Sequence, residues 1–120
     1  MSMSSDVLTF VQACDQTPSP NNVELYFKLI EEELEELIVA REECDEVEQL
    51  DACLDLIWVI LGYAHMKGYQ VEPAWAEVAR SNLDKIDKIT GKVIKREDGK
   101  VLKPADWKEP QLSSFIKAKM

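Results

Sequence analysis

The sequence predicts an all-α fold, with a four-helix-bundle-like core, a short N-terminal helix and an irregular C-terminal arm. Apolar and acidic residues recur three and four positions apart over residues 29–62, which is the spacing of a single helix face. The link inside that stretch is short, so its two helices should be antiparallel neighbours. A chain of 120 residues, 46% of them hydrophobic, is large enough to bury a core and too apolar to be disordered.

The first half of the chain contains a short helix, a loop and a long helix. The short helix begins at Asp6, because apolar residues follow it at helical spacing. Prolines and asparagines over residues 17–22 predict a loop. Asn21 or Asn22 should cap the second helix, which runs to about Glu42.

The second half begins with a helix that Asp45 should cap and Gly68 should end. A fourth helix opens near Pro73, whose missing N–H does no harm in a first turn. Over residues 90–102 the pattern changes to short β-prone runs around Asp98-Gly99, which predicts a small hairpin or an irregular loop with turns.

The whole chain, residues 1–120, is predicted to be one domain. Residues 1–20 supply the N-terminal helix and loop, residues 21–88 the helical core, and residues 89–120 a basic loop and arm. The arm has few apolar residues besides Trp107, so we expect Trp107 to be buried against a partner subunit.

Charge is distributed unevenly along the chain, which carries a net charge of -9. Residues 24–55 hold 13 acids and 2 bases, a net of -11, whereas residues 80–108 hold 9 bases and 5 acids, a net of +4. The overall charge argues against non-specific binding of nucleic acid or of an anionic membrane. The acidic and basic segments together suit a polyanion held through metal ions and lysines, such as a nucleoside polyphosphate.

The cysteines and the hydropathy pattern indicate a cytoplasmic protein. The three cysteines are odd in number and lack CxxC spacing, which favours reduced thiols over a disulfide framework. No secretory signal is visible, and no apolar run reaches the length of a membrane span.

Carboxylates lie in register with apolar residues on both central helices. Glu33 and Glu36 share one face of the first, and Glu48, Asp51 and Asp55 share one face of the second. Acids at the edge of a packing face are costly unless they are paired or metal-bound. Two such helices laid antiparallel would gather at least four carboxylates, and Mg²⁺ takes oxygen ligands of that kind.

Two ordered motifs carry a resemblance to a known superfamily. EExxE at residues 32–36 and ExxD at residues 48–51 resemble the MazG-like all-α nucleoside triphosphate pyrophosphohydrolases. Residues 51–55, 77–85 and 96–104 look like the phosphoribosyl-ATP pyrophosphohydrolase-like subgroup, which includes dUTP diphosphatase-type enzymes. The likeness covers nearly the whole chain, and the ordered set is far more specific than EExxE alone.

The resemblance implies a role for each matching residue. Four residues would hold Mg²⁺, for which Mn²⁺ is a possible substitute: Glu33, Glu36, Glu48 and Asp51. Glu32 would orient or deprotonate the attacking water. The expected substrate-binding residues are Asp55, Asn82, Lys85, Lys100 and Lys103. The remaining acids of the segment are interpreted as a solvated helix face: Glu31, Glu35, Glu42 and Glu43.

The expected activity is Mg²⁺-dependent hydrolysis of a nucleoside triphosphate between its α- and β-phosphates, giving a monophosphate and pyrophosphate. The substrate would be dUTP or another nucleotide, in house-cleaning or pool balancing. One alternative is the same cut on phosphoribosyl-ATP, and another is a non-catalytic acidic helical interaction module. Half-buried acids and an arm that needs a surface also predict a homodimer or a higher homo-oligomer.

Overall fold

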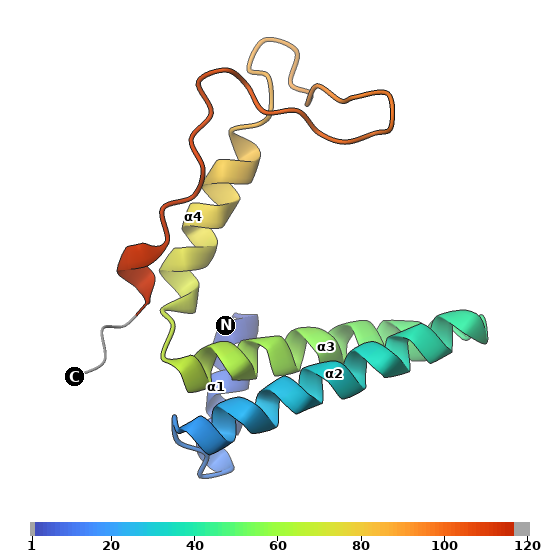
Figure 1. Ribbon diagram of the computed structural model, residues 1–120, viewed down its shortest axis with the longest axis vertical. Coiled ribbons are helices and arrows are strands. Elements are labelled where there is room, and N and C mark those ends of the chain that lie inside the picture. Colours follow the sequence, from blue (N-terminus) through green and yellow to red (C-terminus); the bar gives the residue numbers. More distant parts are fainter. Residues whose placement is uncertain (1, 117–120) are drawn as a thin grey trace. The chain divides into compact units, whose positions relative to one another are not determined.

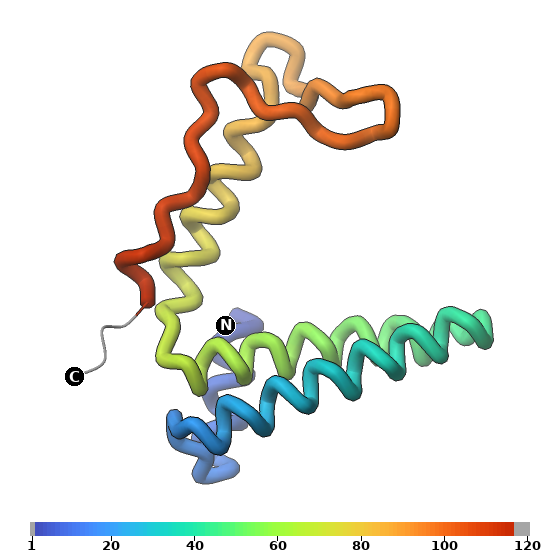
Figure 2. The backbone as a smooth tube through the Cα atoms, viewed as in Figure 1, coloured from blue at the N-terminus to red at the C-terminus, as the bar shows by residue number. Residues whose placement is uncertain are grey.

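The computed structural model describes residues 2–116, which contain four α-helices and no strand. In chain order these helices are α1 (Met3–Ala13), α2 (Pro20–Glu42), α3 (Glu46–Lys67) and α4 (Val71–Leu83), followed by the 3₁₀ helix η1 (Ser113–Phe115) (Figure 1). Figure 2 traces the backbone through them. The predicted all-α class is confirmed, with the short N-terminal helix counted among the four. The last residues of the predicted arm, 117–120, lie outside the described residues.

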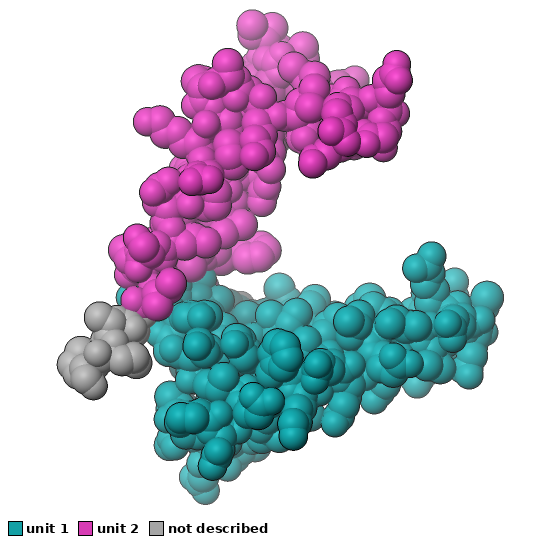
Figure 3. All heavy atoms as spheres, viewed as in Figure 1, with its two compact units in different colours: residues 1–71 teal, residues 72–120 magenta. Residues whose placement is uncertain are grey.

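The chain divides into two compact units, residues 1–71 and residues 72–120 (Figure 3). The prediction of a single domain stays a prediction. Within residues 2–116 no helix combines the length and the apolar character needed to cross a membrane. All three cysteines are free and exposed.

Unit 1 is built on the antiparallel pair α2 and α3. Tyr26 of α2 lies against Gly62 of α3. Glu33, which follows Tyr26 by seven residues, interacts with Asp55, which precedes Gly62 by seven, as expected when the two helices run in opposite directions. A Cβ atom at position 62 would collide with the Tyr26 ring, so the glycine allows the two helices to approach closely at this point.

The core of unit 1 lies at one end of this pair, where α1 packs on α3. Val7 and Val11 of α1 are its most buried side chains, and they cluster with Tyr26, Val59 and Met66. A polar contact joins the same helices, since Nε2 of His65 lies 3.0 Å from the backbone oxygen of Ser4.

The caps of α3 are those predicted from the sequence. The Asp45 side chain accepts a hydrogen bond of 3.0 Å from the backbone N–H of Glu48, and Gly68 ends the helix with φ at 77°.

Two predicted helix starts were wrong. α2 is capped by Ser19, not by Asn21 or Asn22, because Pro20 occupies the first helical position. α1 begins before Asp6, since Ser2 forms a capping box with Ser5.

Unit 2 consists of α4, an irregular loop and the arm. After α4 the chain makes only isolated antiparallel bridges within the described residues, Ile86 with Val93 and Lys95 with Val101. The irregular alternative of the loop prediction is therefore the observed one. The arm then runs back along α4 (Figure 2), where the indole N–H of Trp107 donates a 2.6 Å hydrogen bond to the Ser81 carbonyl oxygen.

The expectation that Trp107 needs a partner subunit was wrong. The side chain is half-buried on α4 of its own chain. A second bond fixes the arm further along, as the backbone N–H of Gln111 donates to Oε2 of Glu77 at 2.8 Å. The Trp107 side chain thus packs on a surface within unit 2.

Candidate functional site

An acidic cluster lies on the facing sides of α2 and α3 in unit 1. Glu33 and Glu36 are separated by three residues on α2, and Asp51 and Asp55 by four on α3, so each pair shares a helix face. The antiparallel register brings the two pairs together, because the charges of both aspartates act on Glu33. Three of the four predicted metal ligands, Glu33, Glu36 and Asp51, thus interact electrostatically, together with Asp55, and their role as ligands stays a prediction.

Glu33 is the most perturbed acid of this cluster. Burial raises its pKa, and the negative charges of Glu36, Asp55, Asp51 and Glu32 raise it further. Its Oε1 atom is buried and has no hydrogen-bond partner among the described residues. A buried carboxylate oxygen without a donor is costly, so this position favours either a proton or a cation.

Asp55 is perturbed in the same direction. Burial raises its pKa, the charge of Asp51 adds to the effect, and a hydrogen bond with the Asp51 side chain favours the protonated form. Like Glu33, Asp55 is therefore easier to protonate than an ordinary aspartate. Asp55 thus belongs to the acidic cluster, although the sequence assigned it to substrate binding.

Two of the predicted residues lie at the margin of the cluster. Glu32 is exposed, and its charge contributes to the raised pKa of Glu33. Glu48 is also exposed, in the first turn of α3, and it is not among the charges that perturb Glu33 or Asp55. The structure therefore does not bring Glu48 into the cluster, and its role as a ligand stays a prediction.

The cluster is chemically suited to a hard divalent cation. Its donors are all carboxylate oxygens, which Mg²⁺ prefers, and one of them is a buried oxygen without a partner. No group of three or more acids, histidines or cysteines in residues 2–116 has the spacing of a metal site as it stands. The acids are near enough to repel one another, and a cation would relieve that repulsion.

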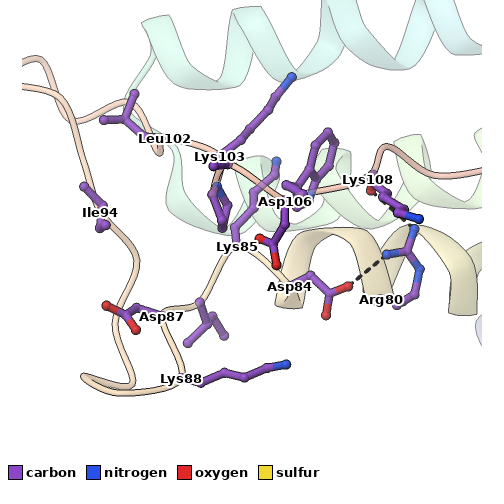
Figure 4. A pocket seen from close by; sticks show the side chains of 14 residues that line it. Arg80, Asp84, Lys85, Asp87, Lys88, Ile94, Leu102, Lys103, Asp106 and Lys108 are labelled. Carbon is purple, nitrogen blue, oxygen red and sulfur yellow. Dashed lines mark hydrogen bonds and ion pairs between the residues drawn. The ribbon is translucent and has the colours of Figure 1, made fainter.

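Unit 2 contains a basic cleft of about 730 Å³ (Figure 4). It is lined by the end of α4, the loop and the arm, with Lys85, Lys103 and Trp107 among its residues. Lys85 and Lys103 extend to the same side of the cleft, away from the ion pair of Arg80 and Asp84 (Figure 4). The structure therefore brings together two of the predicted substrate-binding lysines.

The other predicted residues of unit 2 lie outside the cleft lining. Asn82 is exposed, and its Oδ1 accepts a hydrogen bond of 3.1 Å from Nζ of Lys85. Lys100 is exposed in the turn after Gly99, where its backbone N–H donates to Asp98. Asn82 is thus coupled to the cleft through Lys85, whereas Lys100 has no such link among the described contacts.

Sequence reasoning missed the ion-pair network that ties the arm to α4. Arg80 pairs with Glu77 at 2.9 Å and with Asp84 at 2.8 Å, and its guanidinium also reaches the backbone oxygens of Lys108 and Glu109. The hydrogen bond from Arg80 lowers the pKa of Glu77, and the bond from the Gln111 N–H lowers it further. The only sequence signal was the helical spacing of Glu77, Arg80 and Asp84, the last of which follows the end of α4.

An all-α chain with an antiparallel helix pair that carries opposed carboxylates is the arrangement expected of a MazG-like nucleotide pyrophosphohydrolase. The family model described as phosphoribosyl-ATP pyrophosphohydrolase matches residues 9–82, and the chain belongs to that family. The family consists of hydrolases acting on phosphoric anhydride bonds. No curated protein matches the chain in sequence. The match includes the whole acidic cluster and ends before Lys85, so the residues of the arm lie beyond it.

Proposed function

We propose that this protein is a Mg²⁺-dependent pyrophosphohydrolase that cleaves a nucleotide between its α- and β-phosphates, releasing pyrophosphate. The acidic cluster is the observation that carries the proposal. Its carboxylates repel one another, and Glu33 keeps a buried oxygen without a partner. Membership of the phosphoribosyl-ATP pyrophosphohydrolase family supports the same reaction.

We assign the cation to Glu33, Glu36, Asp51 and the neighbouring Asp55, with Glu48 as a further predicted ligand. Mg²⁺, when bound, neutralises charge on the phosphate oxygens. The family is typically metal-dependent, and Mn²⁺ is expected to substitute. Because all of these ligands are carboxylates, cation binding should compete with protonation of Glu33 and Asp55.

Glu32 is proposed to orient the attacking water and accept its proton. It follows Glu31 on the exposed side of α2 and lies about 100° around the helix from Glu33. It can therefore serve a water molecule without ligating the same ion as Glu33. Its carboxylate is exposed, so the proton it accepts can pass to solvent.

The substrate we place first is phosphoribosyl-ATP. The family description names that compound, and it supports this substrate better than the dUTP-type activity expected first from the sequence. The bond that is cut is the same in both cases. dUTP and the other nucleoside triphosphates are therefore alternative outcomes of one experiment.

A second copy of the chain is proposed to cover α2 and α3. Large apolar side chains on this pair are exposed: Leu34 (47%), Ile38 (42%), Val47 (77%), Leu50 (62%) and Leu54 (54%). Exposed large apolar side chains on both helices favour association with another surface, and a pair of helices is half of a four-helix bundle. Sedimentation should show a homodimer or a larger assembly, and a stable monomer at micromolar concentration would contradict it. The cytoplasmic location stays a prediction.

The test is turnover of a substrate panel with Mg²⁺, followed by separation of the products by ion exchange. The panel contains phosphoribosyl-ATP, dUTP and the common ribo- and deoxyribonucleoside triphosphates. A monophosphate product together with pyrophosphate identifies the bond. The double variant Glu36→Ala, Asp51→Ala should lose about a hundredfold or more of the rate, because two charge-stabilising groups are gone.

The matched control is Glu31→Ala, Glu35→Ala, which removes the same number of acids from the solvated side of α2. This variant should keep its rate. Undiminished turnover after loss of Glu36 and Asp51 would refute the site. If no nucleotide of the panel is hydrolysed with Mg²⁺ or with Mn²⁺, the result supports a non-catalytic acidic helical module instead.

A further inference from the structure

We propose that Trp107 is a positioning residue that holds Lys85 and Lys103 as a cradle for a polyphosphate anion in the cleft of unit 2. The inference rests on the proposed function only in naming a nucleotide as the source of that anion. Apart from Arg80, the residues that line this cleft lie beyond the region matched by the family model.

The Trp107 ring is fixed to α4. Its indole N–H donates a 2.6 Å hydrogen bond to the Ser81 carbonyl oxygen, and Ser81 itself is 2% exposed. The Ser81 hydroxyl donates in turn to the Val78 carbonyl oxygen at 2.8 Å. A carbonyl in the last turn of a helix has no intrahelical donor, so the indole also satisfies an acceptor that the helix leaves open.

This ring gathers two ammonium groups that are distant in the sequence. Nζ of Lys85 lies 5.2 Å from the ring centroid, and Nζ of Lys103 lies 4.8 Å from it. Both distances are those of cation–π contacts, which attract each lysine to the indole face despite their mutual repulsion. Lys85 is further oriented by Oδ1 of Asn82, at 3.1 Å. Among the described residues, the indole is the group that both ammonium groups contact.

Neither ammonium group forms an ion pair with an acid of residues 2–116. The ion pairs among the described residues belong to Arg80 and Arg96, which take Glu77, Asp84 and Asp98. Asp106 lines the same cleft without pairing with either lysine. Two unpaired positive charges on one ring favour an anion that can contact both.

The dimensions and charge of the cleft select a polyphosphate over a smaller anion. A volume of about 730 Å³ is that of a small-molecule site, and it is larger than one phosphate group needs. Lysine ammonium groups are compact point charges with three donors each, so two of them can bind successive phosphates of one chain. The net charge of -9 repels anions elsewhere, which makes such a local positive site necessary for an anionic ligand.

The experiment is calorimetric titration of the full chain with inorganic tripolyphosphate in EDTA, so that the acidic cluster holds no metal. The wild type should bind, and the affinity should fall as salt rises. Lys103→Met and Trp107→Leu should each weaken binding about tenfold or more. Trp107→Phe keeps an aromatic face for both lysines and should stay within about threefold of the wild type.

The matched control is Lys92→Met, which removes an exposed lysine of the same loop that does not line the cleft. It should bind like the wild type. Absence of binding by the wild type would overturn the cradle, as would equal losses in Lys92→Met and Lys103→Met. If Trp107→Leu perturbs the circular dichroism spectrum, Trp107→Met is measured instead, and undiminished tripolyphosphate binding by the folded variant would overturn the role of Trp107.

Failure of the cradle and failure of the proposed function give different results. Tripolyphosphate binding without turnover of any nucleotide would refute the pyrophosphohydrolase and leave the cradle intact. Turnover of a nucleotide without tripolyphosphate binding would refute the cradle and leave the pyrophosphohydrolase intact. Titration with dUTP in EDTA identifies the source of the anion. If dUTP binds more tightly than tripolyphosphate, the cleft recognises a nucleotide, and if the two bind equally, it recognises the phosphate chain alone.

Discussion

Replacing Glu33 by glutamine should stabilise the metal-free protein, although it removes a proposed ligand. The substitution keeps the shape of the side chain and removes its interactions with four acids: Glu36, Asp55, Asp51 and Glu32. A like-charge pair three or four residues apart on one helix costs about 0.2–0.5 kcal/mol, and we take each of the four repulsions on Glu33 to be of that order. Relief of four such pairs should raise the free energy of unfolding by about 1 kcal/mol, or the Tm by about 4 °C for a chain of this size.

The gain should depend on pH with a defined sign. Burial and neighbouring acids raise the pKa of Glu33 in the folded state, so the folded protein binds more protons than the unfolded one above the ordinary glutamate pKa of about 4.3. The free energy of unfolding of the wild type therefore falls as pH rises from the ordinary glutamate pKa to the raised pKa of Glu33. Glu33→Gln lacks this loss, and its advantage should grow from about pH 4 towards neutrality.

The assay is thermal and urea unfolding at low ionic strength, in EDTA and in Mg²⁺. Saturation at a hundred times the dissociation constant would stabilise the wild type by about 2.7 kcal/mol, and Glu33→Gln should gain less because it has lost a ligand. The control Glu31→Gln makes the same change on the exposed side of α2 and should move neither value. A less stable Glu33→Gln in EDTA at pH 7, or equal stabilisation of both proteins by Mg²⁺, would refute the reasoning.

Two further predictions concern packing and the arm. Gly62→Ala should destabilise unit 1 by about 1–3 kcal/mol in urea unfolding, because the new Cβ collides with the Tyr26 ring, and an unchanged midpoint would mean that α2 and α3 are not this close. The hydrogen bond from Arg80 lowers the pKa of Glu77, so the Glu77 carboxylate stays ionised to a lower pH than usual. It should accept the bond from the Gln111 N–H fully above the ordinary glutamate pKa, and that bond should be lost as pH falls through the lowered pKa. Glu77→Gln should abolish this pH dependence of the hydrogen-exchange protection of the arm. Equal protection of the wild-type arm above and below the lowered pKa of Glu77 would contradict the prediction.

Much of the fold was predictable because its signals are local. Asp45 and Gly68 mark the ends of α3 through the chemistry of a single cap, which requires no knowledge of the rest of the chain. The start of α2 was misplaced because Pro20 competes with two asparagines, and its preference for the first helical position decides the boundary. Trp107 was misassigned because its surface lies 26 residues earlier in the chain, at Ser81.

The sequence by itself determined the helices and the acidic faces. Helical spacing places Glu33 with Glu36, and Asp51 with Asp55, whatever the helices pack against. A short link between two helices then leaves antiparallel packing as the only compact arrangement.

Only the tertiary structure decided which acids meet, how their pKa values shift and where the arm lies. Close contact at Gly62 sets the register of α2 on α3, and that register brings Glu33 to Asp55, whereas Glu48 is not among the charges that act on either. Burial and Coulomb repulsion depend on distances between side chains from different helices, which spacing along one helix does not determine. For the same reason, the indole that joins Lys85 to Lys103 becomes visible only once the arm is folded onto α4.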